Sequence, residues 1–498
     1  MKKLTNLLIA LTAGIGTLNA GVVPTNVAQK VATNFYGMST NKIATTLTLV
    51  HQENDAAGNA LYYVYNVNQA DGWVIISAED AARPIIGYSD HGQYVEPAPH
   101  SNFDFWMNYR KNELIHIRTY SNQIVPLVSN EWMAYINNTR PIGNNTKKVQ
   151  VATGPLCQST WDQQYQPYPY NYFCPPNTKG LVTTSGQSVT GCVATAMAQI
   201  MRYWSYPAKG TGSHSYCDCS SSGYTDNWGT LSANFAHTYN WSAMTLSPAT
   251  TSKVTTADTD IARLMSDCGI SVEMDYDPNG SGAFVLSSEA GGGNAACAQY
   301  SYATYFGYQK DLHGIQYSSA KSEAAWIDSL EKEFTNKRII QYEGQASDGG
   351  HTWVCDGNDA TSPYNNVHMN WGWSGYDDGF FAVTNLDPDN SMPAFNTDLA
   401  ALIYIQPPSS PTSVVDIAPE TNVSVYPNPS NGSFTFELNN VQNKQQLAVF
   451  NMLGQNVYNT ELNEGKTQVN FTQTSGIYFY RILSVEGNVT STGKLIVK

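Results

Sequence analysis

A polar, glycine-containing turn gives way to a helical pattern at Cys192, and this transition constrains the fold of the 498-residue chain more than any other local feature. Cys192 therefore stands at a helix N-terminus, where free backbone N–H groups and the helix dipole favour an anion. A thiol in that position loses its proton readily and becomes a nucleophile, although free cysteines are also common as buried structural residues. The helix is predicted because apolar residues recur at spacings of three and four, namely Val193, Met197, Ile200, Met201 and Trp204.

The N-terminus has the pattern of a secretory signal peptide over residues 1–20. Lys2 and Lys3 precede an apolar stretch, and small residues follow around Ala20, where we expect cleavage. No later apolar run reaches the roughly 18 residues of a membrane helix, so we expect no membrane span. The net charge of −14 argues against nucleic acid and anionic membranes as partners.

Export permits disulfides, and the chain has 8 cysteines. If Cys192 remains a free thiol, an odd number is left, so at least one more is unpaired or pairs between chains. His214, Cys217 and Cys219 lie close in sequence, but a fourth ligand at a recognised zinc spacing is missing. We therefore predict no metal and no cofactor, and the disulfide connectivity stays open.

Composition and periodicity divide the rest of the chain into residues 21–148, residues 149–406, a Pro/Ser-rich linker at 407–414, and residues 415–498. In the second segment helices precede strands, which is an α+β order. Polar residues 144–148 are expected to form an exposed, cleavable junction. The expected helices cover residues 103–120, 130–138, 192–204, 257–268 and 321–335, and the expected strands cover residues 62–67, 72–77, 84–89, 339–342, 352–356, 367–371, 380–383 and 401–405. The last segment alternates in short runs between turns, which predicts a small all-β sandwich.

A cysteine nucleophile that transfers an acyl group needs a base, a residue that orients the base, and donors for the oxyanion. His351 follows two glycines and precedes a strand, which suits a ring exposed at the lip of a sheet. His368 is the rival base, and strand alternation places it on the same face as Asn370. Asn370 can accept a hydrogen bond from the base, and Trp371 can shield that bond from water. The order Cys, His, Asn is the papain-like arrangement, although the local papain signature is missing.

Three segments that contain these residues resemble the streptopain family of papain-like cysteine proteases. They are residues 190–201, Gly350-His351-Thr352-Trp353-Val354, and Asn370-Trp371-Gly372-Trp373-Ser374-Gly375, within a likeness that spans roughly residues 150–406. The resemblance implies that Cys192 is the nucleophile and His351 the proton carrier. It also implies that Asn370 and Trp371 orient and shield the histidine.

The family's oxyanion donors are a glutamine side chain and the backbone N–H of the nucleophile. Gln163 fits the glutamine, with Gln164 and Gln166 as alternatives in register, because inserted residues 164–169 lengthen this loop. Two features depart from the family pattern. Glu343 falls where the family often has Gln, and residues 281–297 match poorly.

The family tends to favour a bulky apolar side chain at the second residue before the scissile bond. Trp353, Trp371 and Trp373 could form the wall of such a pocket. Residues 281–297 could instead reshape it, because poorly matching loops of this kind often build substrate pockets.

The terminal segments carry resemblances of their own. Residues 72–80 and 84–89 resemble the family's inhibitory propeptide. The run Val425-Tyr426-Pro427-Asn428-Pro429 and the closing residues 494–498 resemble the sorting domain read by the type IX secretion system of Bacteroidetes-type bacteria. A generic β-sandwich binding module is the alternative for this last domain.

These features predict the secreted zymogen of a cysteine endopeptidase. An α+β propeptide, a papain-like protease domain and an all-β sorting domain follow one another, and the protein reaches the cell surface or the medium through the periplasm. Protein or peptide substrates, its own propeptide and the type IX machinery are the expected partners. The alternatives are another Cys-dependent acyl-transfer enzyme, such as an amidase or transpeptidase, and a non-catalytic adhesin on a protease scaffold.

Overall fold

The computed structural model divides the chain into two compact units, Met1–Pro408 and Ser409–Lys498. It describes residues 21–99, 101–120, 124–141, 152–164, 169–175, 187–224, 227–248, 256–346, 349–359, 366–383, 399–408, 422–439, 444–452, 455–484 and 489–498. The predicted signal peptide, the junction at residues 144–148 and most of the predicted linker lie outside these residues.

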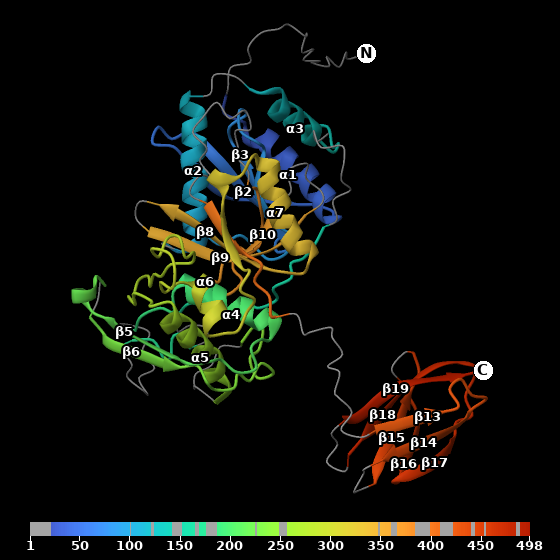
Figure 1. Ribbon diagram of the computed structural model, residues 1–498. Helices are drawn as coiled ribbons and strands as arrows, with labels where there is room; N and C mark the ends of the chain where they lie inside the picture. The colour runs from blue at the N-terminus through green and yellow to red at the C-terminus, as the bar shows by residue number, and fades with distance from the viewer. Residues whose placement is uncertain are drawn as a thin grey trace, which may run out of the picture. The chain divides into compact units, whose positions relative to one another are not determined.

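A ten-stranded antiparallel sheet runs through the first unit in the order β1-β2-β3-β4-β11-β10-β9-β8-β12-β7. Figure 1 labels its strands β2, β3, β8, β9 and β10. The strands are β1 (Leu47–Asn54), β2 (Ala60–Val67), β3 (Gly72–Ser77), β4 (Ile85–Ser89), β7 (His313–Gln316), β8 (Ile340–Ala346), β9 (Gly349–Asn358), β10 (Val367–Asn370), β11 (Gly379–Phe381) and β12 (Leu399–Ile403). The N-terminal segment and the second segment therefore share one sheet, which joins where β4 pairs with β11.

The seam between β4 and β11 is closely packed. Tyr88 lies opposite Phe380 and stacks on its ring at 5.3 Å. The Tyr88 hydroxyl donates to Asp359 at 2.7 Å, which adds a buried polar contact across the seam. Gly87 lies opposite Phe381, and a Cβ at Gly87 would overlap the Phe381 ring, so a larger residue would push the two strands apart.

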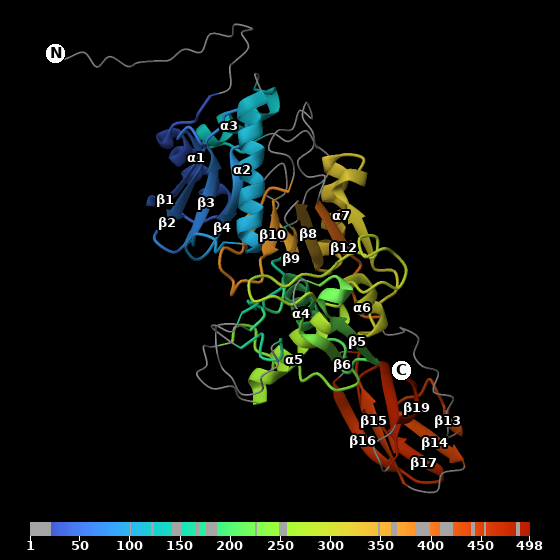
Figure 2. The ribbon, with the colours of Figure 1, turned by 90° about the vertical axis from the view of Figure 1, so that its left-hand side faces the viewer.

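Successive side chains of a strand point to opposite faces of the sheet, so alternate residues of the central strands belong to different hydrophobic cores. On β9, Trp353 belongs to the core beneath α2 (Asn102–Tyr120) and α7 (Glu323–Thr335), whereas Val354 belongs to the core beneath α4 (Cys192–Trp204) and α5 (Thr256–Ser271). The remaining helices are α1 (Thr25–Thr40), α3 (Pro126–Ile136), α6 (Ala298–Thr304) and the short turns η1 (Ser220–Ser222) and η2 (Tyr317–Ser319). Figures 1 and 2 show α1–α3 with β1–β4 at one end of this unit and α4–α6 at the other.

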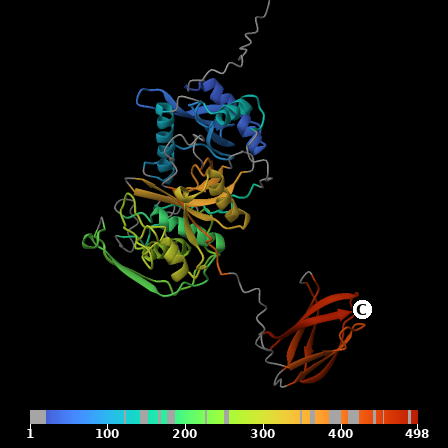
Figure 3. The ribbon, with the colours of Figure 1, turned by 45° about the horizontal axis from the view of Figure 1, so that its top comes forward.

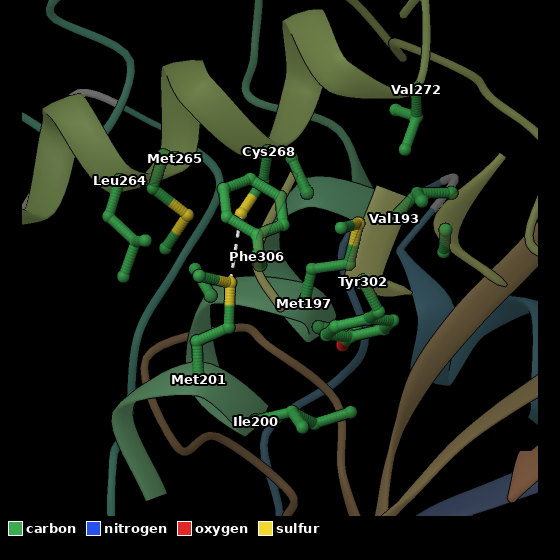
Figure 4. Close-up of a cluster of buried hydrophobic side chains, with 14 of the residues drawn as sticks. Val193, Met197, Ile200, Met201, Leu264, Met265, Cys268, Val272, Tyr302 and Phe306 are labelled. Carbon is green, nitrogen blue, oxygen red and sulfur yellow. Dashed lines mark hydrogen bonds between the residues drawn. The ribbon is translucent and has the colours of Figure 1, made fainter. Parts of the chain in front are cut away.

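Helix α4 covers the residues predicted from the sequence, and its apolar face packs on α5. Figure 4 shows the Met201 side chain pointing toward the side chains of α5, with the Cys268 thiol 3.7 Å from the Met201 sulfur, whereas Ile200 points away from α5. Trp204 is only partly buried and donates to the Ile405 carbonyl. This packing fixes the axis of α4 and therefore the position of its first residue, Cys192.

Two segments of the chain lie near the N-terminal end of α4. The hairpin of β5 (Ser213–Asp218) and β6 (Gly229–Asn234) extends along the edge of the helical part (Figure 3). Its end carries a disulfide between Cys217 and Cys219. Residues 281–297 are mostly irregular and end at Cys297, whose sulfur caps α6.

The second unit is a two-sheet sandwich, as the alternating sequence predicts. Its sheets have the orders β13-β14-β17 and β16-β15-β18-β19. The strands are β13 (Asn422–Tyr426), β14 (Ser433–Asn439), β15 (Gln445–Phe450), β16 (Asn456–Leu462), β17 (Gly465–Asn470), β18 (Gly476–Leu483) and β19 (Val489–Val497). Phe434, Phe436 and Leu438 point from β14 into a core of its own. Among the described helices of the chain, none has the length and hydropathy that a membrane crossing requires.

Candidate active site

Cys192 is the first residue of α4, where the sequence analysis places it. Gly191 precedes it with φ 84°, a left-handed conformation that favours glycine. A Cβ on Gly191 would also approach the Met274 sulfur to 2.7 Å. The turn therefore depends on glycine, and it presents the thiol at the free N-terminal end of the helix.

Cys192 and His351 line one cavity of about 710 Å³. His351 lies on β9 opposite Gly344 of β8, so it comes from the sheet, whereas Cys192 comes from the helical side. The cavity therefore lies where the two sides of the domain meet. Its described lining belongs to residues 192–352, with none from the N-terminal segment.

Burial raises the pKa of the Cys192 thiol, although N–H groups of Thr352, Val193 and Cys192 itself act in the opposite direction. The negative charge of Glu343 raises this pKa further. The helix N-terminus thus supplies the expected donors. The expected easier loss of the proton is not realised in this state, because the thiol is 8% exposed and desolvation dominates.

Asn102, the first residue of α2 in the N-terminal segment, contacts His351 directly. The His351 Nδ1 lies 3.0 Å from the Asn102 Oδ1. The Asn102 amide donates to the carbonyls of Thr352 at 2.9 Å and Trp371 at 2.7 Å. The Phe105 ring lies 5.0 Å from the imidazole. The sequence analysis does not identify Asn102, and its only signal is a small polar residue just before an expected helix.

Asn370 lies at the end of β10 and is buried. Its Oδ1 accepts from the Gln199 side chain at 3.0 Å and from the Gly372 backbone at 3.1 Å. Its Nδ2 donates to the Ser159 carbonyl at 2.8 Å. Asn370 therefore ties β10 to α4, and the hydrogen bond from the base that we expected it to accept goes in this state to Asn102.

Trp371 is fully buried in the core beneath α2, 5.4 Å from the Phe103 ring and 5.2 Å from the Trp353 ring. Its indole N–H donates to the Asp377 carbonyl. Neither Trp353 nor Trp371 lines the cavity at Cys192, and neither does Trp373. The expectation that these three rings form the wall of the substrate pocket is therefore wrong for this cavity.

Gln163 is 7% exposed, and its backbone carbonyl accepts from the Thr190 N–H at 3.0 Å. This bond places the Gln163 loop beside the turn that leads into Cys192. Gln164 shares with Gln163 a backbone bond to the Asp162 carboxylate. Gln166 lies outside the described residues.

The rival base, His368, has a different environment. It is 3% exposed, and its Nδ1 lies 2.6 Å from the Asp356 carboxylate. His368 does not line the cavity that Cys192 and His351 share. The geometry therefore favours His351 as the base and gives His368 a structural ion pair.

His214, Cys217 and Cys219, which lie close in sequence on the β5–β6 hairpin, take part in two separate interactions. Cys217 and Cys219 are joined by the disulfide, and His214 bonds to Glu273 at 2.9 Å. Within the described parts of the chain, no group of three or more His, Cys, Asp or Glu residues is placed to hold a metal ion.

Comparisons with known proteins agree with this architecture. Residues 161–381 match the Peptidase C10 family, residues 20–114 match the Spi protease inhibitor, and residues 424–498 match a secretion system C-terminal sorting domain. The sorting domain marks the chain for secretion by the type IX system.

Relatives of the chain are proteases. Streptopain of Streptococcus pyogenes is 32% identical over 355 residues, which cover 69% of this chain and 80% of that protein. The thiol protease/hemagglutinin PrtT of Porphyromonas gingivalis is 27% identical over 86% of this chain, but the chain covers only 46% of PrtT. A fragment of Prevotella intermedia prointerpain A superposes with a TM-score of 0.55 at 28% identity, covering 73% of this chain and 99% of the fragment. By sequence and by structure, this chain belongs to the peptidase C10 (streptopain) family of cysteine proteases.

Proposed function

We propose that the protein is the secreted zymogen of a cysteine endopeptidase in which Cys192 is the nucleophile and His351 the proton carrier. The observation that carries this proposal is the cavity that these two residues line together, with the His351 ring bonded to Asn102 of the inhibitory segment.

Hydrolysis follows from these two side chains. His351 takes the thiol proton, and the Cys192 sulfur forms a bond to the carbonyl carbon of the scissile peptide. The Cys192 N–H and the Gln163 side chain donate to the oxyanion. Collapse of this intermediate breaks the C–N bond, and His351 gives the proton to the leaving amine. Water then attacks the thioester and passes a proton to His351, and the C–S bond breaks to release the acid.

Inhibition has two structural supports. Asn102 holds the ring that must exchange protons with the thiol, and β4 extends the protease sheet at β11. Activation therefore requires that β4 leave β11 and that Asn102 release His351. We propose that Asn370 then accepts the hydrogen bond from the free ring and that Trp371 shields it. We expect the cut that allows this release near Lys147 or Lys148, and N-terminal sequencing of the active form checks it.

The boundaries 21–148, 149–406, 407–414 and 415–498 also belong to this proposal. The structure separates its two compact units at residue 408, inside the proposed linker. Protein and peptide substrates and the type IX machinery are the proposed partners, without nucleic acid.

A casein-cleavage assay with thiol alkylation tests the enzymatic proposal. Iodoacetamide should stop casein cleavage and label Cys192, which lines an open cavity, before the buried thiols such as Cys268 and Cys355. Cys192→Ser should fold and lose cleavage. Cleavage that survives complete modification of Cys192 would overturn the proposal. Binding without any cleavage would favour the adhesin, and cleavage of small amides alone would favour an amidase.

A further inference from the structure

The cavity at Cys192 contains a buried carboxyl group that the mechanism does not use. Glu343 lies on β8 opposite Thr352 of β9 and is 2% exposed. It lines the cavity, and its charge acts on the Cys192 thiol. Among the described residues, the Glu343 Oε1 has no hydrogen-bond partner. A buried acceptor without a partner is costly, so a structure that keeps one calls for an explanation.

A second carboxyl group lies near Glu343. It belongs to Glu289, from the irregular residues 281–297, and it acts on the Glu343 carboxyl electrostatically. Burial and the charge of Glu289 raise the pKa of Glu343 well above its usual range. Two neighbouring carboxyl groups cannot both ionise at low cost, and a cation placed against them would remove this repulsion.

Apart from Cys192 and His351, the described charged side chains that line the cavity are all acidic. Glu273 and Asp275 line it with Glu343, and of the described lining residues none is Lys or Arg. Glu273 is already bonded to His214 and Tyr224. Asp275 is not without a partner either. Of these three carboxyl groups, Glu343 has a buried oxygen for which the described residues supply no hydrogen-bond partner.

Much of the remaining lining of the cavity is apolar. Phe284 is 53% exposed, whereas Val272 and Val285 are each 2% exposed in the same lining. A long side chain with an aliphatic stem and a cationic end matches a lining that combines apolar groups with a buried carboxyl group, because such side chains bury their stems against apolar groups. Lysine and arginine have this form.

We propose that Glu343, supported by Glu289, is the specificity-determining residue of this protease and accepts the cationic end of a substrate Lys or Arg side chain close to the scissile bond. This inference rests on the proposed peptidase function. Glu343 and residues 281–297 are the two features that depart from the family pattern, and the structure brings them close together. The departure therefore modifies the preference for a bulky apolar side chain that the resemblance implies.

Matched peptides test the proposal on enzyme processed from the full chain. Each set carries Lys, Arg, norleucine or Leu at one of the three residues before the cleaved bond. Norleucine has nearly the shape of Lys without its charge. We expect the Lys or Arg peptide to exceed the norleucine peptide in kcat/KM by about tenfold or more at one position, the size of one desolvated charge contact.

Glu343→Gln should remove most of this ratio between the Lys or Arg peptide and the norleucine peptide. The loss of the Glu343 charge also acts on the Cys192 thiol, but that effect is common to both peptides and cancels in their ratio. Active-site titration of Cys192 reports how much of the variant is folded. Glu289→Gln should reduce the ratio in part. Glu331→Gln, on α7 outside the cavity lining, is the matched control and should leave both rates unchanged. A wild-type enzyme that prefers norleucine, or a ratio unchanged in Glu343→Gln, would overturn the inference. Absence of any Cys192-dependent cleavage would instead overturn the proposed function.

Discussion

The Nδ1 of His351 lies 3.0 Å from the Oδ1 of Asn102, 249 residues earlier in the chain. The same Asn102 side chain donates to the carbonyl of Thr352 on β9 and to the carbonyl of Trp371, which directly follows β10. The N-terminal segment therefore engages the proposed base, His351, while the described lining of the cavity beside Cys192 comes from residues 192–352. Inhibition by this segment can act on proton transfer without filling the cavity.

Asn102→Ala should release the inhibition. The substitution removes three hydrogen bonds, each of which contributes about 1 kcal/mol. Water replaces these bonds in part, so the inhibited state should lose about 2 kcal/mol of stability. This loss corresponds to roughly 30-fold faster activation. The measurement is the rate at which the purified full-length zymogen processes itself. Asn108→Ala is the matched control, because Asn108 lies on the same helix and is exposed. Equal processing rates for Asn102→Ala and the wild type would contradict this prediction.

The contact between Asn102 and His351 could not be predicted from the sequence. It depends on the pairing of β4 with β11, and the alternation of each strand specifies only which face is apolar. The partner of a strand is chosen by long-range packing, here by Tyr88 stacking on Phe380 and bonding to Asp359. No local pattern contains that information.

The bounds of α4 follow from its apolar spacing, although residues 192–201 are buried on all sides rather than on one face. The strand expected at residues 352–356 is longer, because β9 runs from Gly349 to Asn358 and contains His351 instead of starting after it. The first strand, β1, is not predicted, because its pattern is largely exposed and polar. The hairpin β5–β6 is missed for the same reason. Trp371 has the flanking residues of the family motif, but its role in this state depends on α2 packing over it.

His351 and His368 should respond differently to substitution. His351→Ala removes the proton carrier, so kcat/KM should fall by at least about 10³-fold in a protein of unchanged stability. His368→Ala leaves the buried Asp356 carboxylate without its ion-pair partner, so it should lower stability by about 3–5 kcal/mol while each folded molecule stays active. Active-site titration with thermal unfolding separates these outcomes. An inactive but fully stable His368→Ala enzyme would refute the assignment.

The C-terminal domain should be needed for export but not for folding. Its core is separate from that of residues 1–408, so deletion of residues 415–498 should leave an intact zymogen in the periplasm. Cell fractionation and immunoblotting measure its location. Full-length Cys192→Ala is the control, since it should be exported normally without activity. Wild-type amounts of the truncated protein in the medium or at the surface would refute the sorting role.

Asp377 should make the inhibitory contact depend on pH. Its carboxylate accepts from the backbone N–H of Val95 in the N-terminal segment at 2.9 Å, and burial raises the pKa of Asp377 to about 7. Departure of the N-terminal segment would return this side chain to water, where an aspartate titrates near pH 4. The inhibited state therefore binds a proton more tightly than the released state. Its stability should be highest in acid, fall as the pH rises from about 4 to about 7, and stay constant above that.

Asp377→Asn tests this linkage, because the amide keeps an acceptor oxygen for Val95 and resembles the protonated acid. The ratio of self-processing rates, wild type over Asp377→Asn, cancels the pH dependence of the shared chemistry. This ratio should lie near one at about pH 4, rise toward pH 7 by at most about tenfold per pH unit, and then level off. Burial also raises the pKa of Asp378 to about 7. Asp378 accepts a hydrogen bond from the Trp371 N–H within the protease segment, so it should titrate alike in the wild type and in Asp377→Asn. A ratio that stays flat from pH 4 to pH 8 would show that Asp377 does not couple protons to inhibition.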